Sequence, residues 1–389
     1  MRVPSYLAGL CLAAAVATSV AAPQPPRFET AARSVRLDGV RLGTDLTPSG
    51  YLNSLRFTVA YDPVDAQWHL WTLTANPGVY PTSGFALSDV VHATSADGYD
   101  FTSTGTLSYG PGGVLPANFG ATIDPPVSYL RAVKAGDSWK LLAWHANDQQ
   151  SPSRWGQYNY NTSISDLGPD PGNRVVTHQG PVSALVTGPG GFHVGAYGLV
   201  NDQLYLRVDS LFRPGVDRDG GGIARFAYSD ASPPLVEDWS AYGEEAELFR
   251  GTPYFWFLES NPGGGRTAAY AHNAGRVLAC GGLLQAFYAL RDVNGGLTQN
   301  NLWYLESPDD GMNWSAPQAL FGDPAFLTLD GAWAPSARFS NPEGVIHGDR
   351  LRVYFRWQQP DAPGGSVDYV VALDSELACD GLFGDGFED

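Results

Sequence analysis

The feature that most constrains the fold is a phrase that recurs along the chain. Each copy is an alternating, β-rich strand that ends in a Ser or an Asp. The copies end at Ser95, Ser163, Ser229, Ser307 and Asp374, with spacings of 68, 66, 78 and 67 residues. An aromatic strand precedes each copy, at residues 68–73, 139–144, 203–208, 284–289 and 351–356. Self-similarity at such a period indicates that one supersecondary unit is repeated.

The content of each unit predicts the architecture. Three strands are visible per unit, and a fourth follows at residues 105–109 and 317–321. Four-stranded antiparallel units repeated radially form a β-propeller, so we predict an all-β, five-bladed propeller. The fifth unit lacks an outer strand, and residues 34–42 are expected to supply it from the N-terminus and close the ring. A pair of β-sandwiches gives no reason for the repeated marker; six blades stay open, because residues 235–280 do not divide clearly.

Composition agrees with many short strands and excludes some partners. The 46 Gly and 29 Pro, with 12% aromatic and only 16% charged residues, are typical of strands joined by tight turns. The formal net charge is −17. Phosphate binding needs clustered cations, so nucleic acid is not expected as a partner.

The N-terminus carries a targeting signal, whereas the acidic C-terminal tail is either a short signature or a flexible end. Residues 1–21 combine a basic start, an apolar run and a small-residue cleavage site, which predicts a secretory signal peptide. Residues 22–376 form the predicted single propeller domain, and residues 377–389 a C-terminal tail. We therefore expect an exported protein that is extracellular, periplasmic or at the cell surface, without a transmembrane segment. Export permits a disulfide between Cys280 and Cys379, which spacing alone does not establish.

Two turns carry a resemblance to known families. Residues 307–314 read S-P-D-D-G-M-N-W, and residues 95–101 read S-A-D-G-Y-D-F. In such turns the Asp caps the backbone and the Gly permits a positive φ. The first matches the Asp-box of sialidase-like propellers, and both are similar to turns of five-bladed furanosidase-type glycoside hydrolases. The resemblance implies a propeller fold, and because the Asp-box in these families is a structural motif away from the active site, it says little about activity. The tail resembles a C-terminal signature of exported proteins of Gram-negative bacteria.

Propeller topology selects the candidate binding residues. The loops that enter the innermost strands share one face with the loops between second and third strands, and ligands normally bind there. Aromatic rings stack on sugars, and polar side chains bond to sugar hydroxyls. The candidate substrate-binding residues on this face are Asn53, His145, Arg154, Trp155, His193, His272, Asn273, Trp333 and Asn341.

The furanosidase resemblance implies three catalytic carboxylates, and this chain departs from that pattern. Asp124 matches the second place, at the start of the inner strand of blade two. Asn53 stands where blade one should carry an Asp, although Asp45 lies one loop earlier, and blade three offers no Glu. Glu343 in blade five is the expected replacement acid. As an alternative to catalysis, each carboxylate could be structural and accept hydrogen bonds from backbone amides around the central channel.

Two functions follow from these observations. The first is an exported, glycoside hydrolase-like propeller that acts on or binds carbohydrate at its axial face, with one protonated and one ionised carboxyl group. The alternative is a non-catalytic propeller that binds a ligand or a protein outside the cell. No metal site or cofactor is predicted. Residues 217–220, D-R-D-G, resemble the start of a calcium loop but lack further oxygen ligands, so calcium stays an open alternative.

Overall fold

The computed structural model describes only part of the chain, and every structural statement below concerns that part. It comprises residues 28–43, 57–75, 87–108, 127–147, 159–172, 177–181, 195–200, 203–209, 221–228, 235–244, 276–280, 283–288, 301–315, 318–321, 327–333, 338–359 and 367–378. These residues form β-strands and no helix, which confirms the all-β prediction. They accordingly contain no helix that could cross a membrane.

The strands of the described residues form five sheets, and the strand order within each sheet runs from the innermost strand outward. The first sheet contains β4 (Phe57–Asp62), β5 (Gln67–Ala75), β6 (Leu87–Ser95), β7 (Asp100–Ser108), β2 (Arg36–Leu37) and β3 (Val40–Arg41). The second contains β8 (Val127–Ala135), β9 (Ser138–Asn147), β10 (Asn159–Gly168) and β11 (Thr177–Pro181).

The remaining three sheets follow the same order. The third contains β12 (Gly195–Val200), β13 (Gln203–Asp209), β14 (Gly221–Tyr228) and β15 (Leu235–Glu244). The fourth contains β16 (Val277–Cys280), β17 (Leu283–Tyr288), β18 (Trp303–Ser307) and β19 (Gln318–Ala319). The fifth contains β22 (Arg338–His347), β23 (Arg350–Gln359), β24 (Val367–Ala378), β1 (Ala31–Ser34), β20 (Thr328–Leu329) and β21 (Ala332–Trp333).

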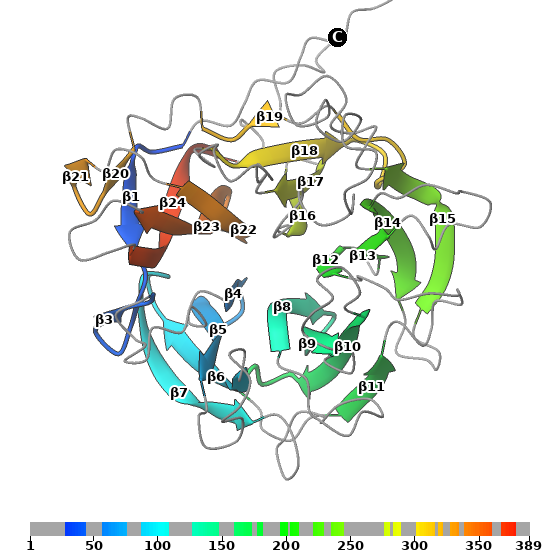
Figure 1. The fold of residues 1–389 in the computed structure, drawn as a ribbon, viewed down its shortest axis with the longest axis horizontal. Coiled ribbons are helices and arrows are strands. Elements are labelled where there is room, and N and C mark those ends of the chain that lie inside the picture. The colour runs from blue at the N-terminus through cyan, green and yellow to red at the C-terminus, as the bar shows by residue number, and fades with distance from the viewer. Residues whose placement is uncertain are drawn as a thin grey trace, which may run out of the picture.

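The sheets are arranged around a common centre, with β4, β8, β12, β16 and β22 innermost (Figure 1). Each of these inner strands contacts the inner strand of the sheet on either side. The recurring phrases occupy matching places: the aromatic strand at residues 68–73 lies within β5, and the marker Ser95 ends β6. Residues 235–280, which did not divide clearly by sequence, include β15 of the third sheet and β16 of the fourth; residues 245–275 lie outside the described residues.

The N-terminal segment joins the first and fifth sheets. β1 pairs antiparallel with β24, and β2 pairs in parallel with β7. The strand that extends the fifth sheet is therefore Ala31–Ser34, whereas most of the expected segment 34–42 pairs with the first sheet. The chain changes sheets at Val35, which is fully buried and donates a backbone hydrogen bond to Val370.

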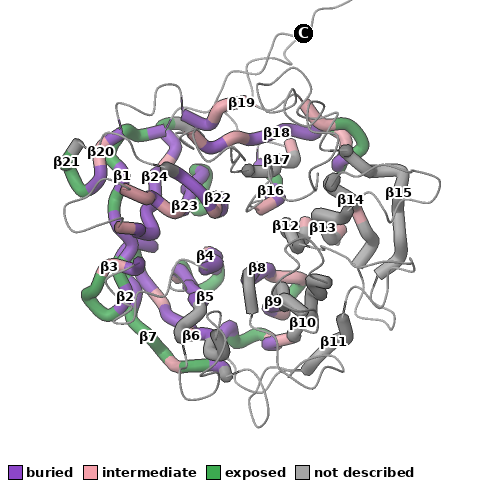
Figure 2. Tube along the Cα trace, in the orientation of Figure 1, coloured by how far each residue is buried: buried purple, intermediate pink, exposed green. Residues whose placement is uncertain are grey.

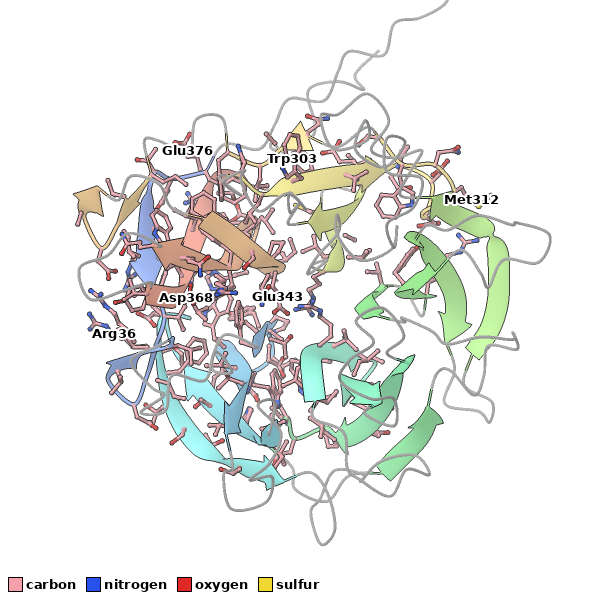
Figure 3. The ribbon with its side chains drawn as sticks, viewed as in Figure 1. Arg36, Trp303, Met312, Glu343, Asp368 and Glu376 are labelled. Carbon is pink, nitrogen blue, oxygen red and sulfur yellow. The ribbon has the colours of Figure 1, made fainter. Side chains whose placement is uncertain are left out.

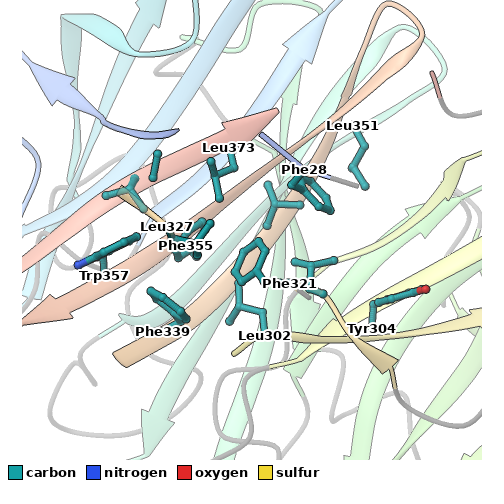
Figure 4. Close-up of a cluster of buried hydrophobic side chains, with 14 of the residues drawn as sticks. Phe28, Leu302, Tyr304, Phe321, Leu327, Phe339, Leu351, Phe355, Trp357 and Leu373 are labelled. Carbon is teal, nitrogen blue, oxygen red and sulfur yellow. The ribbon is translucent and has the colours of Figure 1, made fainter. Parts of the chain in front are cut away.

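The hydrophobic core lies between neighbouring sheets. One cluster joins the fourth and fifth sheets through Phe321, Phe339, Phe355 and other apolar side chains (Figure 4). Two further clusters join the fifth sheet to the first and the first to the second. Buried residues therefore follow the inner and middle strands, and exposed residues follow the outer ones (Figure 2). Aromatic residues in the second strands, such as Trp68 and Trp139, supply much of this buried area.

The turn at Ser307 has the hydrogen bonds that its sequence predicts. Ser307 Oγ donates to Asp309 Oδ1 and accepts from the backbone N–H of Gly311, and Asp309 Oδ1 accepts from the N–H of Asn313. Gly311 has φ +83°. The turn contacts the third sheet, because the hydroxyl of Tyr205 donates to the carbonyl of Asp310.

The turn at Ser95 is built in the same way and docks on the fifth sheet. Asp97 Oδ1 accepts from the backbone N–H groups of Tyr99 and Asp100. The hydroxyl of Tyr354 in β23 donates to the carbonyl of Gly98 at 2.9 Å. Both turns thus link a sheet to the one before it in the chain's circular order.

Candidate functional site

Polar side chains from four sheets meet at the centre of the ring. Thr58 lies in β4, Arg131 in β8 and Glu343 in β22, and Arg276 directly precedes β16. Glu343 lies toward the common centre of the sheets in Figure 3. The strands that carry these residues are otherwise largely apolar, because each inner strand packs against neighbouring sheets on both faces. We call these four residues the axial cluster.

Glu343 is the most buried charged member of the axial cluster. Its side chain is 1% exposed. Oε1 accepts a hydrogen bond from the hydroxyl of Thr58 at 2.6 Å, and Oε2 lies 3.0 Å from Nη1 of Arg131. Nη1 of Arg276 lies 3.5 Å from Oε1. The oxygens of Glu343 therefore face two guanidinium groups and the hydroxyl that Thr58 donates, which are all hydrogen-bond donors. A carboxylate accepts hydrogen bonds from such donors, whereas the proton of a carboxylic acid would find no acceptor among them.

Thr58 connects the carboxylate to the neighbouring strand. Its hydroxyl oxygen accepts a hydrogen bond from the backbone N–H of Ala132 in β8 at 3.0 Å. Burial lowers the pKa of Arg276, and the nearby carboxylate of Glu343 opposes that shift. The cluster therefore links inner strands through both charge and backbone hydrogen bonds.

An irregularity in β22 sets the direction of Glu343. Ser340 pairs with Arg356, and the next pair in register is Glu343 with Tyr354, so the strand bulges between them. Within the bulge, Asn341 has φ +52°, a left-handed conformation that is unusual for a residue other than Gly. Bulges re-aim side chains and are frequent beside active sites. β8 and β12 also have irregular register near their starts.

The structure places few of the residues that the sequence selected for binding. Glu343 and Asn341 are described, and both lie in β22. The backbones of His145 and Trp333 lie in β9 and β21, and their side chains are outside the described residues. The other candidates lie wholly outside the described residues: Asp45, Asn53, Asp124, Arg154, Trp155, His193, His272 and Asn273.

Sequence reasoning selected Glu343 and missed its partners Thr58 and Arg131. It did not select Arg276 either. The available signal was a polar residue inside an apolar inner strand, such as Thr58 in F-T-V-A-Y-D or Arg131 in Y-L-R-A-V. Such a residue needs a buried partner, because an unpaired charge or hydroxyl in a core is costly.

A second buried polar group lies between the first and second sheets. Nδ1 of His69 is 3.2 Å from Nε2 of His92, whose Nδ1 is 2.6 Å from the hydroxyl of Thr104. Trp71 and Trp139 pack around the two rings. Burial, and then the neighbouring imidazole of His69, lower the pKa of His92 to about 4.

Metal ligands are not gathered in the described residues. No three His, Cys, Asp or Glu side chains are grouped there in a way that could hold an ion. Residues 217–220 lie outside this part of the chain, so the calcium alternative is not tested by the structure.

Comparison with known proteins bears on the fold. No family model matches the sequence, and no curated protein matches it. Among solved structures, a thermostable family-43 glycoside hydrolase is similar with TM-score 0.54 and 11% identity, over 85% of this chain and 90% of that chain. At this identity the likeness shows the fold alone, a β-propeller of the kind found in that hydrolase.

Two further solved structures align over most of the chain. One is a family 117 glycoside hydrolase from Zobellia galactanivorans, with TM-score 0.48 and 11% identity over 91% of both chains. The other is an α-L-arabinofuranosidase from Podospora anserina in complex with cellotriose, with TM-score 0.47 and 12% identity, over 92% of this chain and 99% of that chain.

Proposed function

We propose that the five sheets are the blades of a five-bladed propeller closed by the N-terminal segment. The radial arrangement of the sheets supports this proposal, as does the pairing of β1 with β24 and of β2 with β7. One segment that extends both the last and the first blade ties the ends of the ring together. Residues 31–37 are then part of the fold rather than of a free N-terminal extension.

We further propose that the protein acts on or binds carbohydrate at the axial face of this propeller. The observation that carries the proposal is the convergence of Glu343 and Arg131 from two inner strands and of Arg276 from the residue before a third. Convergent charged groups at the centre of a fold shared with a glycoside hydrolase form the default candidate for a ligand site. The aromatic and polar residues assigned to the loops of this face, such as Trp155 and Asn53, suit a sugar.

The catalytic roles follow from the state of Glu343. A general acid must hold a proton and reach the substrate, whereas Glu343 is buried and faces two guanidinium groups. We therefore assign proton transfer to Asp124 and Asp45, which precede inner strands of blades two and one. Glu343 instead fixes the two arginines through its side-chain oxygens. It acts through them and is a positioning residue.

The alternative function is a non-catalytic propeller that binds a glycan, another ligand or a protein. The environment of Glu343 favours this alternative, because the one described candidate carboxyl group is 1% exposed and lies against Thr58, Arg131 and Arg276 inside the fold. The same axial face would bind the ligand without hydrolysing it. A measurement of hydrolytic activity therefore distinguishes the two functions. The location of the site does not, because both functions use the same face.

Export is part of the proposal. The signal peptide at residues 1–21 predicts it, and Cys280 is disulfide-bonded, as an oxidising compartment permits. The mature chain contains one other cysteine, Cys379, which we propose as the partner. The protein would then fold and act outside the cytoplasm.

The experiment is hydrolysis of a panel of aryl glycosides by the purified mature chain, with and without calcium. The panel contains arabinofuranoside, xyloside, fructoside and sialoside. We expect turnover of at least one member, its loss in Asp124→Asn, and its retention in Asp349→Asn, which changes an exposed Asp between β22 and β23. Turnover that survives in Asp124→Asn would refute the catalytic assignment. If the folded protein hydrolyses no member of the panel, the binding alternative is favoured.

A further inference from the structure

The side chain of Arg276 reaches across the centre of the ring. Nη1 donates a hydrogen bond to the carbonyl oxygen of Val59 in β4 at 2.7 Å, and Nη2 donates to the carbonyl oxygen of Ala132 in β8 at 3.0 Å. Arg276 belongs to the fourth sheet, whereas β4 and β8 belong to the first and second. In the circular order of Figure 1 the fourth sheet neighbours the third and the fifth. Besides its contact with Glu343 of the adjacent fifth sheet, the guanidinium therefore reaches across the axis to the first and second sheets.

The backbone groups that it binds are a consequence of sheet topology. An inner strand is an edge strand, so half of its N–H and C=O groups face the axis without a strand to pair with. Buried groups of this kind need another partner. Arg276 supplies donors to the carbonyls of Val59 and Ala132, and the hydroxyl of Thr58 supplies an acceptor to the N–H of Ala132.

Charge and burial complete the arrangement. Arg276 contacts one oxygen of Glu343 and Arg131 contacts the other, so the carboxylate from the fifth sheet lies between guanidinium groups from the fourth and second. The side chains of Arg131 and Arg276 are 9% and 15% exposed, and Thr58 is fully buried. Among the described residues, buried side chains from the first, second, fourth and fifth sheets thus meet at this level of the ring's centre.

We propose that Arg276 closes the axis of the propeller at the level of Val59 and Ala132. Where the proposed glycan function holds, the axial site is then open at one face only. Ligands enter and leave by that face, and a glycan is bound by its end or by a projecting sugar rather than threaded through the ring. Arg276 is in this account a positioning residue, which shapes the site and holds Glu343.

The test uses a thiol as a reporter of access to the axis and contains no sugar. Thr58→Cys is made in the mature chain, and its modification by methyl methanethiosulfonate is followed by mass spectrometry of the native protein. We expect the introduced thiol to be protected. Adding Arg276→Ala should raise its rate of modification roughly tenfold or more, because a buried thiol otherwise reacts only when the structure opens.

Two controls tie the effect to the guanidinium group. Arg36→Ala removes an exposed arginine and should leave the rate unchanged. Guanidinium chloride at low millimolar concentration should restore protection to the Arg276→Ala protein, because the free ion can occupy the vacated place, and sodium chloride at the same concentration should not. Protection that returns with either salt would contradict the assignment.

A second variant covers the case in which Arg276→Ala does not fold. Arg276→Lys keeps the charge but lacks the planar group that reaches both carbonyls at once. In the Arg276→Lys protein the introduced thiol should react faster than with Arg276 in place and more slowly than with Arg276→Ala. An introduced thiol that reacts equally fast whether Arg276 is present or replaced would overturn the proposal. That result would leave the glycan function untouched, since the assay does not depend on it.

Discussion

The guanidinium group of Arg276 and the carbonyl of Ala132 are joined by a hydrogen bond of 3.0 Å, although they belong to the fourth and second sheets of the ring. Contacts between adjacent sheets are mostly apolar and form the core. The contacts across the centre are polar and charged. The centre of the ring is therefore polar, whereas the interfaces between its sheets are apolar. The proposed site lies at the axial face of this polar centre.

Glu343→Gln should destabilise the fold strongly. The change removes the negative charge between Arg131 and Arg276 and leaves two buried guanidinium groups without it. Breaking a buried ion pair by removing one partner costs about 3 kcal/mol or more. Urea unfolding should show this loss in the midpoint. Glu376→Gln, at an exposed position late in β24, is the matched control and should unfold like the parent. A Glu343→Gln protein as stable as the parent would mean that the cluster is not structural.

The sequence repeat was enough to predict the fold. It did not predict the residues that surround Glu343. Aromatic second strands and Ser-terminated third strands recur because each sheet solves the same packing problem, so Trp68 and Ser95 marked their strands correctly. The strand that extends the fifth sheet is Ala31–Ser34 and not residues 34–42 as predicted, because the chain changes sheets at Val35 and the following residues pair with the first sheet.

The partners of Glu343 depend on three-dimensional convergence. Thr58, Arg131 and Arg276 are far apart in the chain, and nothing in their local sequence shows that they meet. The bulge at Asn341 could not be read from sequence either, because it is set by the register of β22 against β23. A polar residue within an apolar inner strand was the available hint.

Gly98→Ala should be much more costly than Gly39→Ala. Both glycines have positive φ, +76° and +82°, so both substitutions strain the backbone by about 1 kcal/mol. A Cβ at Gly98 would also lie 2.7 Å from the hydroxyl of Tyr354 and 2.8 Å from the ring of Trp68, whereas a Cβ at Gly39 meets nothing within 4 Å. Thermal unfolding of the two variants isolates the packing cost. Equal losses would mean that the turn does not dock tightly on the fifth sheet.

His92 should make the fold less stable in acid. Its pKa falls from 6.5 to about 4 on folding, so the unfolded chain binds the proton more readily. The contribution to stability is complete above pH 6.5 and is lost as the pH falls toward 4, by about 3 kcal/mol in total. The measurement is the free energy of unfolding of parent and His92→Gln between these limits.

The comparison between the two proteins is needed because other groups titrate in the same range. Burial raises the pKa of Glu306 to about 7, and this group makes the fold less stable as the pH rises through that value. Its contribution is common to both proteins and cancels in the difference. If His92→Gln and the parent lose stability equally on acidification, the imidazole pair does not control this behaviour.

Removal of the disulfide should destabilise the protein by about 4 to 5 kcal/mol, because the bond from Cys280 to the proposed partner Cys379 closes a loop of about 100 residues. Cys280→Ser, Cys379→Ser and the double variant should lose the same amount. Dithiothreitol should lower the melting temperature of the parent and leave the double variant unchanged. A Cys379→Ser protein that behaves like the parent would assign the bond of Cys280 to another partner.

The most direct test of the central claim is a glycan array probed with the mature Asp124→Asn protein, which should bind a substrate without consuming it. We predict binding to at least one class of glycan, and its loss when Trp155→Ala or Asn53→Ala is added on the axial face. This result would hold for a hydrolase and for a binding module alike. Folded protein that binds no glycan, or binding that survives both changes, would contradict a carbohydrate site at the axis.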